Sequence, residues 1–308
     1  MIIEENATVS ESVDFDELQD MALENAVQVE AAYGDMMLEA ARNEFAMYKE
    51  TGKIDAVNEG AIDSIKAWIK KAWENLKRIF SRVVAKIRGW IGNSKTFYNK
   101  YAKEIEAGAS KVADFKGYTY RGLGKISEGI KGIYSDVMSD MADGKTAGLD
   151  DKGAEKKILS SLGAKFKGGD FAKSVKDAGR GSDEKKKIKI PIDTIKDDLV
   201  NGKEIMTQLK SSFNAAQAAF NMAENGLDDD DKEASKSITG ARVAVSKINA
   251  VCNITTSLFA ERLSQSKAYA SAAVQASKKA GSKTEDNKST NESAEDIENW
   301  LQENGLTD

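Results

Sequence analysis

Proline is almost absent from this chain, because Pro191 is the only one in 308 residues. Ordinary proteins contain about 5% proline. Long helices tolerate few prolines, since the residue lacks an amide hydrogen and its ring clashes with the preceding turn. Apolar residues also recur at steps of three and four over long stretches, which is the spacing of one helix face. The sequence therefore predicts a mainly α protein, an elongated multi-helix bundle with a small irregular α+β middle region.

The clearest amphipathic pattern lies in residues 61–93. On a helical wheel its apolar side chains occupy an arc of about 160°, and basic side chains lie opposite and on the flanks. The apolar face consists of Ile62, Ile65, Ile69, Trp73, Leu76, Phe80, Val83, Ile87 and Trp90. The basic side chains are Lys66, Lys70, Lys71, Lys77, Arg78, Arg82, Lys86 and Arg88. Because this helix is amphipathic throughout, we do not expect it to span a bilayer on its own.

Charge is segregated at the start of the chain. Residues 1–60 carry 15 acidic and 3 basic side chains, whereas residues 61–93 carry 8 basic and 2 acidic ones. Residues 14–49 also show a helical apolar pattern among their acids, and Gly52 follows as a helix-ending glycine. The opposite charges attract strongly at low ionic strength. These two helices are therefore expected to form an antiparallel hairpin.

Three roles fit the basic helix. Its apolar face can pack on other helices of the protein while its cations face water or an acidic partner. Alternatively, tryptophan and isoleucine can insert into a membrane surface while the cations contact anionic headgroups. In the third role, the cations pair with the phosphates of a nucleic acid. The acidic neighbour favours the packed role, and a hairpin that opens later would connect it with the membrane role.

Composition divides the whole chain into five regions. The glycine- and lysine-rich middle contains two candidate strands, at "YTY" (118–120) and "KIKIPID" (187–193). Proline in the second candidate suits an edge strand. We expect a flexible N-terminus (1–12), a helical hairpin region (13–114), a middle region with short strands (115–200), a pair of long helices (201–280) and an acidic disordered tail (281–308).

The chain has no histidine and one cysteine, Cys252. These counts exclude a Ser-His-Asp or Cys-His catalytic system, an internal disulfide and a zinc cluster. Cys252 falls on the apolar stripe of its helix, which predicts a buried thiol. The basic run in "GRGSDEKKKIK" (179–189) is of a type that contacts phosphate, although such runs are more often solvated loops. No catalytic residue, metal ligand or cofactor site is predicted, and we expect no enzymatic activity.

The order of segments gives a resemblance. An acidic helix precedes "IKAWIKKAWENLKRIFSRVVAKIRGWI", then come "FKGYTYRGLG", "LGAKFKGGDFAKSVKDAGRG" and the long "SKINAVCNITTSLFAERLSQSKAYASAAVQASKKA". Over about residues 12–280 this organisation resembles virion structural proteins of large tailed bacteriophages, especially internal or minor head proteins. The resemblance implies a non-enzymatic, multi-copy protein that is made in the host bacterial cytoplasm and assembled into the virion. Its implied partners are the capsid, further copies of itself and packaged DNA, with which it could be ejected.

Phage head proteases often cut after a glutamate that follows an apolar residue by two positions. In "VNEG", Val57 and Glu59 fit that pattern, so the resemblance makes Glu59 a candidate maturation cleavage site. Cleavage there would release the acidic segment and expose the basic helix. The alternative function is that of a membrane-interacting protein, an ejection factor or helical toxin, that acts through residues 61–93.

Overall fold

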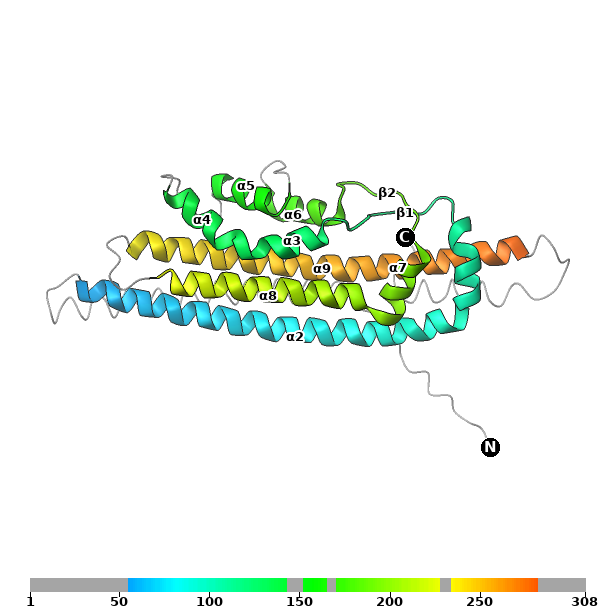
Figure 1. Ribbon diagram of the computed structural model, residues 1–308, viewed down its shortest axis with the longest axis horizontal. Helices are drawn as coiled ribbons and strands as arrows, with labels where there is room; N and C mark the ends of the chain where they lie inside the picture. Colours follow the sequence, from blue (N-terminus) through cyan, green and yellow to red (C-terminus); the bar gives the residue numbers. More distant parts are fainter. Residues whose placement is uncertain (1–54, 143–151, 165–169, 228–233, 282–308) are drawn as a thin grey trace, which may run out of the picture.

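A computed structural model describes residues 55–142, 152–164, 170–227 and 234–281 (Figure 1). Helices dominate these residues, and the only sheet among them has two short strands. The mainly α class with a small strand region is therefore confirmed. The predicted acidic helix, the N-terminus and the C-terminal tail lie outside the described residues.

Three long helices run side by side along the molecule: α2 (Asp55–Gly108), α8 (Lys203–Asn225) and α9 (Ala234–Gly281) (Figure 1). At 54 residues, α2 is about 80 Å long. Tyr101 has non-helical angles (φ −117°, ψ 22°), and beyond it the end of α2 turns away from the long axis. The amphipathic stretch of residues 61–93 is only part of this helix, since α2 continues through Gly92 to Gly108.

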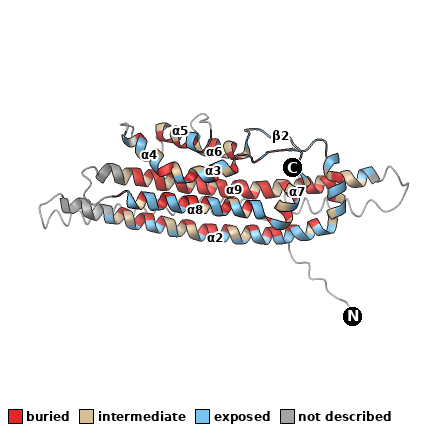
Figure 2. Cartoon of the chain, viewed as in Figure 1, coloured by how far each residue is buried: buried red, intermediate tan, exposed pale blue. Residues whose placement is uncertain are grey.

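Helix α9 forms the centre of the bundle. On the side away from α2, it is covered by α3 (Leu123–Gly129), α4 (Ile133–Ala142), α5 (Lys152–Ser161) and α6 (Phe171–Arg180) (Figure 1). Figure 2 shows buried residues around most of its length. Among the described helices, α9 alone is long and apolar enough to cross a bilayer by length and composition, yet 78% of its most apolar window is buried in the protein. A buried core helix can be as long and as apolar as a helix that crosses a bilayer.

Aromatic side chains join α2 to α8. The ring of Trp73 lies 5.0 Å from that of Phe213 and 5.4 Å from that of Phe220, and the rings of Phe80 and Phe213 are 5.2 Å apart. Tilted ring pairs at these distances add about 0.5–1.5 kcal/mol each beyond the burial of their area. These contacts belong to a single apolar cluster that also includes α9 and the middle segments.

The two strands, β1 (Lys116–Gly117) and β2 (Lys186–Lys187), pair antiparallel with Lys116 opposite Lys187. β1 lies just before its predicted position at 118–120, and β2 overlaps the predicted range 187–193 only at Lys187. The side chain of Gln265 accepts a hydrogen bond from Tyr118 N at 2.7 Å and donates one to Tyr118 O at 2.8 Å, so these groups cannot extend a strand ladder. Pro191 is the N-cap of α7 (Ile192–Lys196). The predicted strand at 187–193 therefore ends early, where a helix begins.

A π-helix, Asp197–Asn201, connects α7 to α8. The carboxylate of Asp197 accepts hydrogen bonds from the backbone N–H groups of Lys203 (3.3 Å) and Glu204 (2.9 Å), which caps α8. Gly202 lies between the two helices with φ 60°, and a Cβ there would clash with Ile91 Cδ1. This tight junction directs the first turn of α8 toward α9.

Candidate functional site

The basic side chains predicted as contacts for an anionic partner lie along the outer surface of α2. Lys70, Lys71, Arg78, Arg82 and Arg88 are exposed, whereas Lys66, Lys77 and Lys86 are half-buried. We call the five exposed side chains the cationic face. It extends over about five turns of one helix and is therefore linear.

Some side chains of this region contact their neighbours. Lys70 Nζ lies 3.2 Å from Glu224 Oε1, and Arg78 donates a hydrogen bond to Asn75 Oδ1 at 3.3 Å. Lys77 pairs with Glu74, and its ammonium lies 5.9 Å from the centre of the Trp73 ring. Exposed pairs of this kind are worth at most about 1 kcal/mol. An anionic partner can therefore displace them at small cost.

The apolar face of α2 is used in the core. Ile65, Ile69, Leu76, Phe80, Val83, Ile87 and Trp90 are each exposed by less than a tenth, and Trp73 is half-buried against them. The side chain of Ile62 lies outside the described set. Insertion into a membrane would require α2 to leave α8 and α9, which would expose this whole face.

The candidate cleavage residue, Glu59, lies near the start of α2, which begins at Asp55. Its backbone is helical, and its side chain lies outside the described set. Proteases act most readily where the chain opens locally. Cleavage after Glu59 would therefore require the first turns of α2 to unwind.

An apolar groove of about 710 Å³ runs between α2 and α8. Its apolar lining consists of Phe80, Val84, Met206, Leu209 and Phe213. Ser81 and Thr207 also line it, as do three cations: Arg88 from α2, and Lys203 and Lys210 from α8. The groove thus extends the positive charge of the cationic face onto α8.

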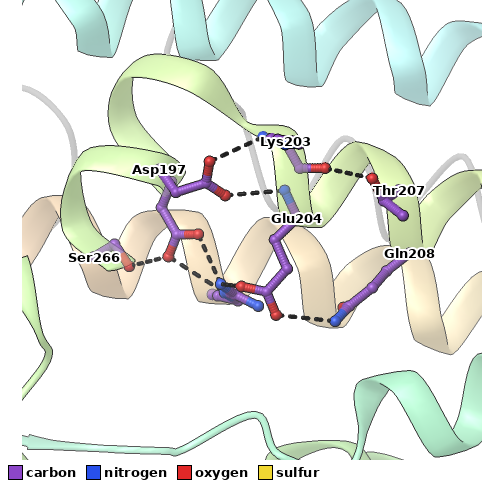
Figure 3. A network of polar contacts seen from close by, with 8 residues as sticks. Asp197, Lys203, Glu204, Thr207, Gln208 and Ser266 are labelled. Carbon is purple, nitrogen blue, oxygen red and sulfur yellow. Dashed lines mark hydrogen bonds and ion pairs between the residues drawn. The ribbon is translucent and has the colours of Figure 1, made fainter. Parts of the chain in front are cut away.

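A second polar cluster was not predicted from the sequence. It is centred on Arg262 of α9, whose guanidinium donates hydrogen bonds to Asp198 Oδ1 (2.9 Å) and Glu204 Oε2 (2.7 Å) (Figure 3). Ser266 donates to Asp198 at 2.5 Å, and the amide nitrogen of Gln208 donates to Glu204 at 3.0 Å. We call these five residues the Arg262 network. It joins α9, the π-helix and α8.

Burial and pairing set the charges of this network. Burial raises the pKa of the Asp198 carboxyl above its ordinary value, and Arg262 partly offsets that effect. The hydrogen bond from Arg262 lowers the pKa of Glu204. Burial opposes the charge on Arg262, but its bonds to Glu204 and Asp198 outweigh burial and raise the guanidinium pKa. Arg262 is therefore a permanent buried cation held by two acidic groups.

A polar cavity of about 450 Å³ lies beside this network. Its walls come from residues 118–121, 188–191 and the Arg262 network, and none of its lining residues belongs to α2. One wall contains Tyr120, whose φ of 52° is the only positive value at a described residue other than glycine. The cavity is therefore separate from the cationic face.

Long-range pairing explains why the sequence did not reveal this site. Asp198 and Glu204 lie close together in the sequence, but Arg262 follows about sixty residues later. The one available signal was a charge on an otherwise small and apolar helix face, where Arg262 follows Phe259 by three positions. Such a charge indicates that Arg262 has an acidic partner in the interior, but the local sequence does not show which residue that partner is.

Two further observations bear on chemistry. Cys252 is buried as predicted, and burial raises the pKa of its thiol to about 12. In the described parts of the chain, no three acidic or cysteine side chains are grouped to hold a metal ion.

Comparisons with protein families, with curated proteins and with solved structures found no match to this chain.

Proposed function

We propose that this protein is a non-enzymatic structural component of a tailed-phage particle, an internal or minor head protein. In this proposal it binds acidic partners, a capsid surface or packaged DNA, through the cationic face of α2. The observation that carries the proposal is the division of α2 into a buried apolar face and an exposed row of cations. The membrane alternative is less favoured because the apolar face is already packed.

The spacing of the cations supports binding to an extended anionic partner. Lys71, Arg78 and Arg82 follow one another by seven and four residues, so they lie on one side of α2. They span about 16 Å along the helix axis. A straight row of this length can contact several phosphates of a duplex, which carries one charge per about 1.7 Å of its axis.

The interior supports a structural role. The charges of the Arg262 network are paired with one another. The thiol of Cys252 stays protonated near neutral pH because of its raised pKa, so it does not supply a thiolate nucleophile. These groups stabilise the packing of helices.

DNA binding is tested with the full-length protein and a fluorescent duplex of about 20 base pairs over a series of salt concentrations. The triple variant Lys71→Glu, Arg78→Glu, Arg82→Glu should bind far more weakly, and its affinity should depend less on salt, by a slope of about 0.9 for each phosphate no longer neutralised. The control, Lys103→Glu, Lys173→Glu, Lys196→Glu, changes exposed lysines elsewhere by the same total charge. Equal binding by both variants would refute a role for the cationic face in DNA binding.

The particle assignment is tested by mass spectrometry of purified virions. We expect the chain in many copies, and its observed N-terminus shows whether cleavage occurs after Glu59. A chain that is absent from virions but sediments with anionic liposomes would refute the structural role and favour the membrane alternative.

A further inference from the structure

The apolar groove between α2 and α8 is open at the protein surface. It follows α2 over residues 80–88 and α8 over residues 203–213, so it has the length of about two to three helical turns. Val84, Met206 and Phe213 line it and are only half-buried. Helix-in-groove recognition places the apolar face of an amphipathic helix in such a groove, with anchor residues at steps of three and four.

Positive charge surrounds this apolar strip. Arg88, Lys203 and Lys210 line the groove and are exposed. Among the residues that the structure describes, the lining contains no acidic side chain, and none of these three cations forms an ion pair. A complementary segment therefore carries a short apolar face with acidic side chains beside it, because complementary charges select the partner.

The C-terminal tail of this chain contains such a segment, "EDIENWLQEN" (295–304). Residues 291–308 hold six acidic side chains and no basic one. Trp300 and Leu301 follow Ile297 by three and four residues, so all three share one face of a helix. On the same helical wheel, the acids lie on the flanks and on the opposite side. The segment thus complements the groove in both charge and polarity.

Signals for the start and the end of a short helix flank this segment. Ser293 precedes Asp296 by three positions, which is the spacing of a capping box, and Gly305 follows as a helix-ending glycine. Isolated helices shorter than about 12–15 residues are marginal in water. Packing of the apolar face in a groove would therefore supply the stability that so short a helix lacks on its own.

The tail is long enough to reach the groove. Helices α2 and α9 run in the same direction, and the Lys267 ammonium lies 5.6 Å from the centre of the Trp90 ring, so these two positions are level along the bundle (Figure 1). From Lys267 to Gly281, the end of α9, the distance is about 21 Å, and from Trp90 back to Val84 it is about 9 Å. The tail must therefore cover about 30 Å along the bundle, whereas residues 282–296 span up to about 50 Å when extended.

The acidic segment of residues 14–49 is the other candidate within the chain. As a helix it would be about 54 Å long, which is several times the length of the groove. The tail segment instead matches the groove over its whole length. A short flexible tether also holds the tail at an effective concentration of the order of mM. Even a modest affinity of the groove is then sufficient for docking.

We propose that the groove between α2 and α8 binds the chain's own C-terminal segment, residues 295–303, as a short amphipathic helix. The three apolar side chains of the segment pack on the apolar lining, and its flanking acids face the three cations. Docking also brings acidic side chains to Arg88, at one end of the cationic face. The tail then competes with a DNA duplex for that end, and this consequence rests on the proposed function.

Disulfide cross-linking in the full-length protein tests the contact. The one natural cysteine, Cys252, is buried, so cysteines introduced in pairs react with each other in the presence of oxidised glutathione. Met206→Cys with Leu301→Cys should form a monomeric cross-link several-fold faster than Ser211→Cys with Leu301→Cys. Ser211 is the matched control, since it is exposed on the same helix, about 7.5 Å away along the axis, and lies outside the lining. Val84→Cys in place of Met206→Cys should give the same result from the α2 side.

Two changes should slow this cross-link several-fold. Ile297→Ser with Trp300→Ser removes two apolar anchors without a change of charge, and Arg88→Glu reverses one cation of the groove. Lys173→Glu is the control for charge, because Lys173 is exposed on α6, outside the lining, and it should leave the rate unchanged.

The remaining outcomes overturn the proposal. Equal rates at Met206 and Ser211, or rates that survive the loss of the apolar anchors, show that the tail does not occupy the groove. A covalent dimer in place of the monomeric product assigns the groove to the tail of a second copy. Faster cross-linking of Met206→Cys to Met21→Cys than to Leu301→Cys assigns it to the acidic segment of residues 14–49.

Competition with DNA is measured separately from docking. Ile297→Ser with Trp300→Ser should bind the duplex several-fold more tightly, although the net charge of the protein is unchanged. An unchanged affinity would refute the competition. A protein that binds no duplex would refute DNA binding by the cationic face, and the cross-linking rates would still decide whether the tail docks.

Discussion

Replacing Arg262 by methionine tests the Arg262 network, because the change removes the guanidinium and keeps a long apolar side chain. Asp198 is fully buried, and two of its hydrogen bonds come from Arg262 (2.9 and 3.3 Å), the third from Ser266. Removal of one partner of a buried ion pair costs about 3–5 kcal/mol, since the other charge stays buried. That is a large fraction of a typical unfolding free energy of about 5–15 kcal/mol.

The free energy of unfolding that the Arg262→Met variant loses should depend on pH, and the direction of this dependence follows from Asp198. Burial already holds the pKa of Asp198 above its ordinary value, and removal of Arg262 takes away the cation that opposes this effect. The native carboxyl then binds a proton at a higher pH than the unfolded one, so stability falls as pH rises through this interval. The variant should therefore lose most stability near pH 7.5 and less near pH 5.

Urea denaturation followed by far-UV circular dichroism measures this loss at both pH values. The double variant Arg262→Met, Asp198→Asn is the control, because it removes the buried charge together with its partner. It should recover part of the loss at pH 7.5. A loss below about 1 kcal/mol at pH 7.5, or one that grows as pH falls, would refute the network as described.

Three further changes probe the packing. Leu76→Ala should cost about 2–5 kcal/mol in urea denaturation, because Leu76 is buried on α2, and a loss below about 1 kcal/mol would show that this face is not in the core. Gly202→Ala should cost more than about 1 kcal/mol, since φ is 60° and the new Cβ would meet Ile91; an unchanged urea midpoint would contradict this junction. Burial lowers the pKa of Lys267 to about 8, so the protein should gain stability relative to Lys267→Met between pH 8 and 10, by at most about 3 kcal/mol. Parallel pH curves of the two proteins would exclude that shift.

The helices could be predicted because their signal is local. The sequence predicted a pair of long helices in residues 201–280, and the first of them is α8, Lys203–Asn225, with Ile205, Leu209 and Phe220 on its buried face. The second helix of the pair is α9, Ala234–Gly281. In both helices, apolar residues at steps of three and four face one core. The pattern within each segment is therefore sufficient to predict that it is helical.

The length of α2 and the position of β1 were not predictable in this way, because they depend on contacts beyond the local sequence pattern. Gly92 lies inside α2, although an isolated glycine costs a helix about 1 kcal/mol. Beyond it, Tyr98 and Ile105 continue the buried face of α2, which outweighs that cost. The position of β1 depends on Gln265, which lies 147 residues after Tyr118. Local patterns carry no information about such a partner.

The polar side chains of α9 explain why this bundle adopts one arrangement. Much of α9 is alanine and serine, and small side chains alone permit neighbouring helices to slide along it. Four longer side chains each contact a different neighbour: Lys247 pairs with α5, Glu261 with α6, Arg262 with the π-helix and α8, and Gln265 with the loop before α3. A shift of α9 by one residue moves each group by about 1.5 Å and rotates it by about 100°, so these contacts would break together. The buried polar groups thus select the register of the helices, and the same register forms the cavity wall at Gln208 and Arg262.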